Sequence, residues 1–215
     1  MKVKKGIIFD VDGTLIRTDI AFVEETIKDT LIETGDGVYN KEKVPYFWWG
    51  GNGIDRGDIL KQEFHVADTE KFWKVWNPHV WNFDYAKKFK SAYEDVAESI
   101  RLLSLEGISL GIVTDPPRAV ADPQIDFFLP RRYFNPILTL SDTPGLKPKP
   151  DPQGLLLCAK QMGLSPDEVD YLGDATNDLL AAKNASMDFI RINRGEHRIY
   201  IPPEREINSL YELLK

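Results

Sequence analysis

Cysteine is almost absent from this sequence of 215 residues, which contains only Cys158. A single thiol excludes both an intramolecular disulfide and a metal site built from several cysteines. Since disulfides mark oxidising compartments, this composition favours a reducing one, and we expect a cytoplasmic protein.

Long apolar runs are also missing. The basic start of the chain is followed only by Ile7, Ile8 and Phe9 before Asp10 interrupts the run. No other run approaches the roughly 18 apolar residues that a membrane-spanning helix needs. We therefore expect no membrane partner.

Positive charge is in deficit, because 27 lysine and arginine residues face 34 aspartate and glutamate residues and the formal net charge is -7. Nucleic acids attract basic surfaces, so we expect no nucleic-acid partner. What is present is a globular composition, 42% hydrophobic and 28% charged, in a chain long enough for a sizeable core.

Short apolar runs recur along the chain with helical stretches between them. This alternation is typical of an α/β fold with a Rossmann-like parallel sheet covered by helices on both faces. The predicted strands are residues 7–9, 108–113, 137–140, 169–172 and 189–192.

Residues typical of helix starts and helix ends lie between and after these predicted strands. Residues 165–168 read Ser-Pro-Asp-Glu, which predicts a capped short helix, and residues 155–162 predict a helix that ends at Gly163. Ile207, Leu210 and Leu213 predict a final amphipathic helix.

Residues 16–92 differ from the rest of the chain in composition and in the spacing of their apolar residues. Apolar residues recur there at helical spacing from Ile20 to Leu31, and all five tryptophans lie in this segment. We interpret 16–92 as an inserted, mainly α-helical domain, with residues 1–15 and 93–215 forming the α/β core.

Asp10 and Asp12 follow the first predicted strand and precede Gly13. A carboxylate at a strand end can attack an electrophile, and a second one two residues later can transfer the proton. Two neighbouring carboxylates repel, and a divalent cation relieves that repulsion. The alternative is an ordinary turn, since Asp and Gly are favoured turn residues.

Asp174 and Asp178 repeat this arrangement after the fourth predicted strand, four residues apart. Carboxylate oxygens favour Mg²⁺ over softer transition metals. The alternative is capping, because acidic residues stabilise a helix start.

Thr114 and Asp115 follow the second predicted strand, where a hydroxyl and backbone amides can bind an anion. Lys147 and Lys149 lie in a proline-rich segment that can hold a lysine against a phosphate. The alternatives are a helix cap for the first pair and solvated lysines for the second. Because the carboxyl ends of parallel strands form one edge, these clusters can meet in space.

Taken together, DVDGTL, the Thr of IVTD, the Lys of KPDP and GDATND resemble the haloacid dehalogenase superfamily of phosphohydrolases, in the family's order from Asp10 to Asp178. The chain is most similar to the phosphoglycolate-phosphatase-like type, in which a helical cap is inserted between the first two motifs. The resemblance implies a Mg²⁺-dependent phosphatase that acts on a small phosphorylated metabolite through an aspartyl-phosphate.

The resemblance also implies roles for residues. Asp10 would be the nucleophile and Asp12 the general acid and base. Asp10, Asp174 and the Asp12 backbone carbonyl would bind the metal, with Asp178 supporting it. The phosphoryl group would be bound by Thr114, Asp115, the Gly13 turn and one lysine. Family members place this lysine about one helix and a short loop before the Gly173-Asp174 pair, a distance that favours Lys149 over Lys147.

Several alternatives stay open at this point. A phosphomutase or a 2-haloacid dehalogenase shares the superfamily, although Asp12 favours phosphate chemistry, and a non-catalytic binding module could retain the fold. In the inserted domain, Trp48, Trp49 and the glycine-rich residues 50–54 suggest a loop that faces the substrate, and Arg56 suggests a contact to an anionic leaving group. The alternatives are aromatic packing of a small helical core for the tryptophans and an ordinary surface cation for Arg56. The substrate is undetermined, and we expect a monomer or a homodimer.

Overall fold

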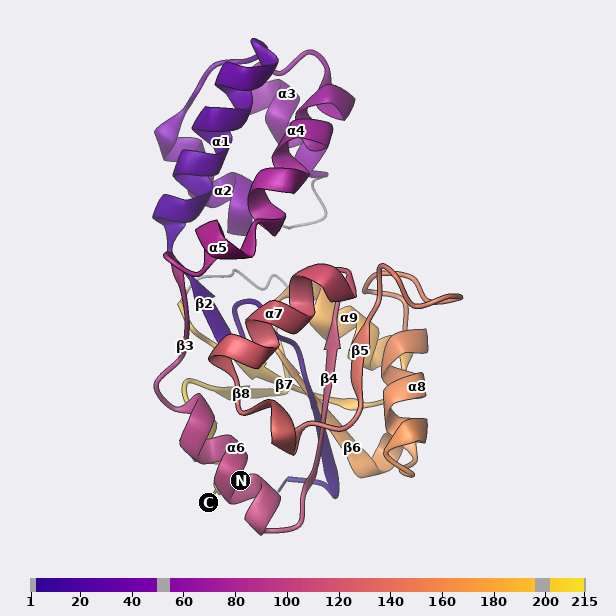
Figure 1. Cartoon of the computed structure of the whole chain (residues 1–215). Coiled ribbons are helices and arrows are strands. Elements are labelled where there is room, and N and C mark those ends of the chain that lie inside the picture. Colours follow the sequence, from indigo (N-terminus) through magenta and orange to yellow (C-terminus); the bar gives the residue numbers. More distant parts are fainter. Residues whose placement is uncertain (1–2, 50–54, 196–201, 215) are drawn as a thin grey trace. The chain divides into compact units, whose positions relative to one another are not determined.

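The computed structural model describes residues 3–49, 55–195 and 202–214. Internal contacts divide the chain into two compact units, Met1–Arg17 with Ser91–Lys215 and, between them in sequence, Thr18–Lys90 (Figure 1). The second unit lies within the segment 16–92 that the sequence sets apart.

A six-stranded sheet forms the centre of the larger unit, in the order β5-β4-β1-β6-β7-β8. Every strand pairs with its neighbour in parallel, so the predicted α/β fold class is confirmed. The strands are β1 Gly6–Phe9, β4 Ser109–Thr114, β5 Ile137–Thr139, β6 Val169–Gly173, β7 Asp188–Ile192 and β8 Arg205–Ile207.

Helices cover both faces of this sheet. Side chains of β1 alternate between the faces, so that Ile7 and Phe9 pack in one apolar cluster and Ile8 in another. The first cluster includes residues of α6 (Val96–Leu105) and α7 (Arg118–Phe128), and the second includes residues of α8 (Gln153–Gln161) and α9 (Thr176–Asn184). Short 3₁₀ helices complete the unit: η2 Arg131–Tyr133, η3 Pro166–Glu168 and η4 Leu210–Leu214.

The end of the chain differs from the predicted amphipathic helix. Ile207 lies in β8 and pairs with Ile192 of β7, and the helical turn η4 starts only at Leu210. Leu210 and Leu213 are buried in the core as an apolar stripe requires. Strand pairing with β7 competes with helix formation here, and the helix is therefore shorter than predicted.

The smaller unit is helical in the part of the chain that the structure describes. Its elements are α1 Ile20–Thr34, η1 Lys41–Lys43, α2 Val44–Trp49, α3 Arg56–Glu63, α4 Thr69–Trp81 and α5 Phe83–Ala86. Two short strands, β2 (Ile16–Thr18) and β3 (Lys90–Ala92), pair where the chain passes between the units.

Aromatic rings build the core of the smaller unit. Phe47 lies 5.5 Å from Trp76 and 6.0 Å from Trp73 between ring centroids, and Phe72 stacks on Trp76 at 5.6 Å. Trp76 is buried, whereas Trp81 at the end of α4 is 46% exposed. Three of the five tryptophans, Trp48, Trp73 and Trp76, therefore pack in or against this core, the simpler of the two interpretations of their clustering.

No helix within the three described ranges is both long enough and apolar enough to span a membrane.

Candidate active site

The predicted clusters follow adjacent strands at the carboxyl edge of the sheet. Asp10 comes directly after β1, Thr114 ends β4, and Asp174 comes directly after β6, the strands on either side of β1. The Asp10 backbone N–H donates to the Leu172 carbonyl at 2.9 Å, which continues the pairing of β1 with β6. The topology thus brings together residues that are more than a hundred positions apart in sequence.

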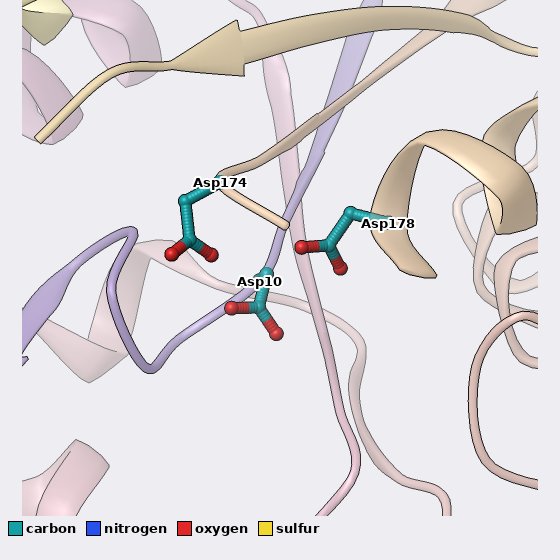
Figure 2. A group of neighbouring side chains, drawn as sticks. All are labelled: Asp10, Asp174 and Asp178. Atoms are coloured by element: carbon teal, nitrogen blue, oxygen red, sulfur yellow. The ribbon is translucent and has the colours of Figure 1, made fainter. Parts of the chain in front are cut away.

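Three carboxylates converge at this edge, as Figure 2 shows for Asp10, Asp174 and Asp178. One oxygen of each lies within 4.8 Å of the others, and all three residues are buried. Asp178 sits in the first turn of α9, and its other carboxylate oxygen accepts from the Ala175 N–H at 3.0 Å. Asp178 therefore caps α9, as the capping interpretation predicts, and also lies beside the other two carboxylates, so its role in the site stays a prediction.

The turn after β1 fits closely around Asp174. Gly13 adopts a φ of +78°, and a Cβ there would lie 2.2 Å from a carboxylate oxygen of Asp174. The Thr14 hydroxyl donates to the same carboxylate at 3.4 Å. Asp12 is half-buried in this turn, and its side chain is not part of the three-carboxylate group. Only glycine satisfies both the backbone conformation and the space at position 13.

Lys149 is the lysine that reaches the carboxylates. Its ammonium donates to Asp10 Oδ1 at 2.5 Å and to Asp178 Oδ1 at 2.7 Å, and the side chain is buried. Lys147 is exposed. Geometry therefore selects Lys149 from the two lysines that the local sequence leaves open.

Asp115 lies in the site but faces the lysine segment. Its Oδ1 accepts from the Lys149 backbone N–H at 3.0 Å, and its Oδ2 lies 3.9 Å from the Lys149 ammonium. A carboxylate repels a phosphate, so these contacts favour a role in holding Lys149 over the phosphate-binding role assigned from sequence.

Burial and mutual repulsion shift the ionisation of the site. Burial raises the pKa of Asp10 to about 8, although the ion pair with Lys149 opposes that rise. Burial and the neighbouring Asp178 raise the pKa of Asp174 well above its ordinary value. For Asp178, burial acts in the same direction, but the Lys149 ammonium together with the hydrogen bonds from Tyr171 and the Ala175 N–H outweighs burial and lowers the pKa.

The donor set fits a hard divalent cation. Three buried carboxylates face one buried ammonium, so the fully ionised site carries an excess of two negative charges. Burial is the main cause of the raised pKa values of Asp10 and Asp174, and repulsion from the neighbouring carboxylates adds to it. All the ligand atoms are oxygens, which Mg²⁺ prefers, and the two positive charges of Mg²⁺ would balance the excess negative charge.

Two of the candidate residues of the smaller unit, Trp48 and Arg56, contact each other. Trp48 and Trp49 end α2, and Arg56 begins α3. The Arg56 guanidinium donates to the Trp48 carbonyl at 3.1 Å and lies 5.4 Å from the centre of its indole ring. The glycine-rich residues 50–54 lie outside the described residues, and the role predicted for this loop stays a prediction.

Sequence reasoning missed Tyr171, whose hydroxyl reaches Lys149 and Asp178 from the middle of β6. Its position three residues before Asp174 in a buried strand was the available signal, since a tyrosine hydroxyl buried in a core requires a polar partner.

A family model described as haloacid dehalogenase-like hydrolase matches residues 7–192. The chain belongs to this family. The phosphoglycolate phosphatase of Escherichia coli K12 is 33% identical over 98% of this chain and 91% of its own length. The phosphoglycolate phosphatase of Psychrobacter arcticus is 28% identical over 89% of this chain and 84% of its own.

The fold recurs in solved structures of the family. A hydrolase from Deinococcus radiodurans R1 with bound phosphate and sodium superposes with a TM-score of 0.73 at 20% identity, over 99% of this chain and 94% of that one. This likeness concerns the fold, and the family match together with the two curated relatives supports a phosphatase.

Proposed function

We propose that this hydrolase is a Mg²⁺-dependent phosphatase that cleaves a small phosphomonoester through an aspartyl-phosphate on Asp10. The observation that carries the proposal is the Lys149 ammonium, held 2.5 Å from Asp10 within a group of three buried carboxylates. A cation fixed beside a carboxylate at a strand end places an anion-binding charge next to a nucleophile.

The residues that would hold Mg²⁺ are Asp10 and Asp174 through their carboxylates and Asp12 through its backbone carbonyl, with Asp178 in support. When bound, the ion supplies two positive charges that keep these carboxylates ionised and neutralise phosphoryl oxygens. The contacts of Gly13 and Thr14 with Asp174 keep that carboxylate directed toward Asp10.

In the first step, a carboxylate oxygen of Asp10 attacks phosphorus, and the bond from phosphorus to the leaving oxygen breaks. Asp12 donates a proton to that oxygen, so the product leaves as a neutral alcohol. Lys149 and the Thr114 hydroxyl bind the phosphoryl oxygens and compensate the charge that spreads over them.

In the second step, water attacks the phosphorus of the aspartyl-phosphate. Asp12 accepts the proton of that water, the bond from phosphorus to Asp10 breaks, and inorganic phosphate leaves. Both aspartates return to their starting state, so one proton-transfer group serves both steps.

We assign the helical unit Thr18–Lys90 the role of a cap that excludes water and recognises the leaving group. In this role Trp48, Trp49 and Arg56 are its candidate contacts to substrate. Both curated relatives described above are phosphoglycolate phosphatases, which makes phosphoglycolate the first substrate to test.

The test is phosphate release from p-nitrophenyl phosphate and from a panel of phosphoglycolate, sugar phosphates, nucleotides and amino-acid phosphates, with Mg²⁺ and with EDTA. We expect turnover that EDTA abolishes. Asp10→Asn should lose at least about a thousandfold in kcat while keeping its circular dichroism spectrum, because the nucleophile is gone but the shape is unchanged.

Three outcomes would contradict the proposal. Near-normal activity of Asp10→Asn would exclude the nucleophile assignment. Isomerisation of a sugar phosphate without phosphate release would indicate a phosphomutase. Halide release from a 2-haloacid with no activity on the phosphate panel would indicate a dehalogenase.

A further inference from the structure

Tyr171 brings a hydroxyl into the active site from inside the sheet. It occupies the third position of β6, is fully buried, and packs its ring 6.2 Å from that of Phe189 on β7. Its side chain lies on the sheet face that α8 and α9 cover, as part of the same apolar cluster as Ile8. Asp178, in the first turn of α9, and Lys149, which precedes α8, therefore lie within its reach.

The hydroxyl closes a ring of three hydrogen bonds. It donates to Asp178 Oδ1 at 2.7 Å, and it accepts from the Lys149 ammonium at 3.4 Å. Lys149 donates to the same Asp178 oxygen at 2.7 Å. Each member of the ring is thus bonded to the two others.

Two partners outside the ring, Asp10 and the Ala175 N–H, complete the hydrogen bonds that hold the two charged groups in this structure. The three N–H bonds of the Lys149 ammonium are directed at Asp10, Asp178 and Tyr171. The Asp178 carboxylate is held by Lys149 and Tyr171 through one oxygen and by the Ala175 N–H through the other. Without the tyrosine hydroxyl, one point of attachment is lost on each group.

We propose that Tyr171 is a positioning residue for the phosphatase reaction: its hydroxyl fixes the Lys149 ammonium relative to Asp178 and so sets where the phosphoryl group binds. The inference rests on the proposed function, because it requires Lys149 to bind phosphate. A phenylalanine would fill the same apolar space, so packing alone does not account for the hydroxyl. A buried hydroxyl is costly unless it is hydrogen-bonded, and its partners here are both residues of the site.

The test is Tyr171→Phe, which removes one oxygen atom and keeps the ring. We expect kcat for p-nitrophenyl phosphate to fall about tenfold at saturating Mg²⁺, the change that loss of a hydrogen bond to charged groups produces. The affinity for inorganic phosphate, measured by calorimetry in the presence of Mg²⁺, should fall several-fold. The matched control is Tyr39→Phe, which removes a buried hydroxyl from the smaller unit and should leave both values unchanged.

A double-mutant cycle separates positioning from packing. If Tyr171 acts through Asp178, the loss of phosphate affinity caused by Tyr171→Phe should shrink to less than about twofold in an Asp178→Asn background. If Tyr171→Phe lowers phosphate affinity equally in the wild-type and the Asp178→Asn backgrounds, Tyr171 does not act through Asp178 and the proposal is overturned.

The two proposals fail in distinguishable ways. A wild-type protein that hydrolyses no phosphomonoester overturns the proposed function. In that case the role of Tyr171 is still decided by comparing the phosphate affinities of the wild type and Tyr171→Phe. An active wild type together with a folded Tyr171→Phe variant, unchanged in kcat and in phosphate affinity, overturns the inference about Tyr171 alone.

Discussion

At the scale of single residues, Lys149 is the group on which the site depends. Burial lowers the pKa of a lysine, but Asp10 and Asp178 outweigh that effect and hold the pKa of Lys149 well above its ordinary value. The ammonium therefore stays charged throughout the pH range in which proteins are stable. Pro148 and Pro150 flank it and restrict the backbone that presents it.

Replacing Lys149 by methionine should lower kcat/KM for p-nitrophenyl phosphate by about a hundredfold or more. The variant keeps most of the side-chain volume but removes the charge that stabilises the phosphoryl oxygens, and loss of one such donor has that effect in other enzymes. The matched control is Lys147→Met, which makes the same change at the exposed lysine and should stay within about twofold of the wild type. Equal losses in the two variants would contradict the assignment of Lys149.

The choice between these lysines shows what local sequence omits. Both precede the pattern Pro-x-Pro, so the motif fits either one. Only the fold shows that Lys149 points toward the carboxylates while Lys147 is exposed. Tyr171 was missed for a similar reason, because a tyrosine in an apolar run is usually a core residue and the partner of its hydroxyl is remote in sequence.

At the scale of elements, one buried ion pair joins several parts of the larger unit. Asp95, just before α6, accepts two hydrogen bonds from Arg194, which follows β7, each at 2.9 Å. It also accepts from the Ser209 hydroxyl and the Leu210 N–H, both at 2.8 Å, at the start of η4. Arg194 in turn donates to the carbonyl of Thr14, in the turn that carries Gly13.

Asp95→Asn should destabilise the fold by about 3 kcal/mol, because it leaves the buried guanidinium of Arg194 without an opposite charge. The measurement is the free energy of unfolding by urea denaturation. Glu98→Gln is the control, since it removes a carboxylate from the exposed pair with Arg101 and should shift the midpoint far less.

The same pair predicts a pH dependence. Burial raises the pKa of Asp95, but the bonds from Arg194, Leu210 and Ser209 outweigh burial and lower it overall. A lowered folded-state pKa contributes stability above the unfolded value, about 4, and that contribution is lost as the pH falls through the folded value. The stability gap between wild type and Asp95→Asn should therefore be constant near neutral pH and narrow below about pH 4. A gap that widens under acid would contradict this account.

The sequence predicted strands correctly where a continuous apolar run was the main signal. Five apolar runs each became a strand, because a strand buried on both faces needs continuous apolar sequence. The run Arg-Glu-Ile of β8 carries no such signal, and its pairing with β7 decides its conformation. That same pairing shortened the helix predicted at the end of the chain.

At the scale of the whole molecule, some of the excess acidic residues are gathered at one site. Part of the formal charge of -7 is concentrated in three buried carboxylates that one lysine does not neutralise. Folding without a cation must therefore either oppose their repulsion or protonate Asp10 and Asp174, whose pKa values are raised. Binding of a cation to the folded state alone should stabilise it.

Mg²⁺ at a hundredfold excess over its dissociation constant should add about 2.7 kcal/mol of stability, which corresponds to a rise of about 5–10 °C in the thermal midpoint of the larger unit. Differential scanning calorimetry with Mg²⁺ and with EDTA measures this shift. Asp174→Asn should lose most of it, whereas Asp188→Asn, which alters an exposed carboxylate on β7, should retain it. A midpoint that does not respond to Mg²⁺ would contradict the metal site.

The central position of β1 has a consequence for how the chain folds. This strand, Gly6–Phe9, precedes the other five strands of the sheet in the chain, and both of its neighbours, β4 and β6, come after residue 108. The intervening unit Thr18–Lys90 has an apolar core of its own and can collapse while β1 still lacks a partner. β1 thus leaves the ribosome well before the two strands that bury it, and until they follow its apolar side chains remain accessible to a chaperone.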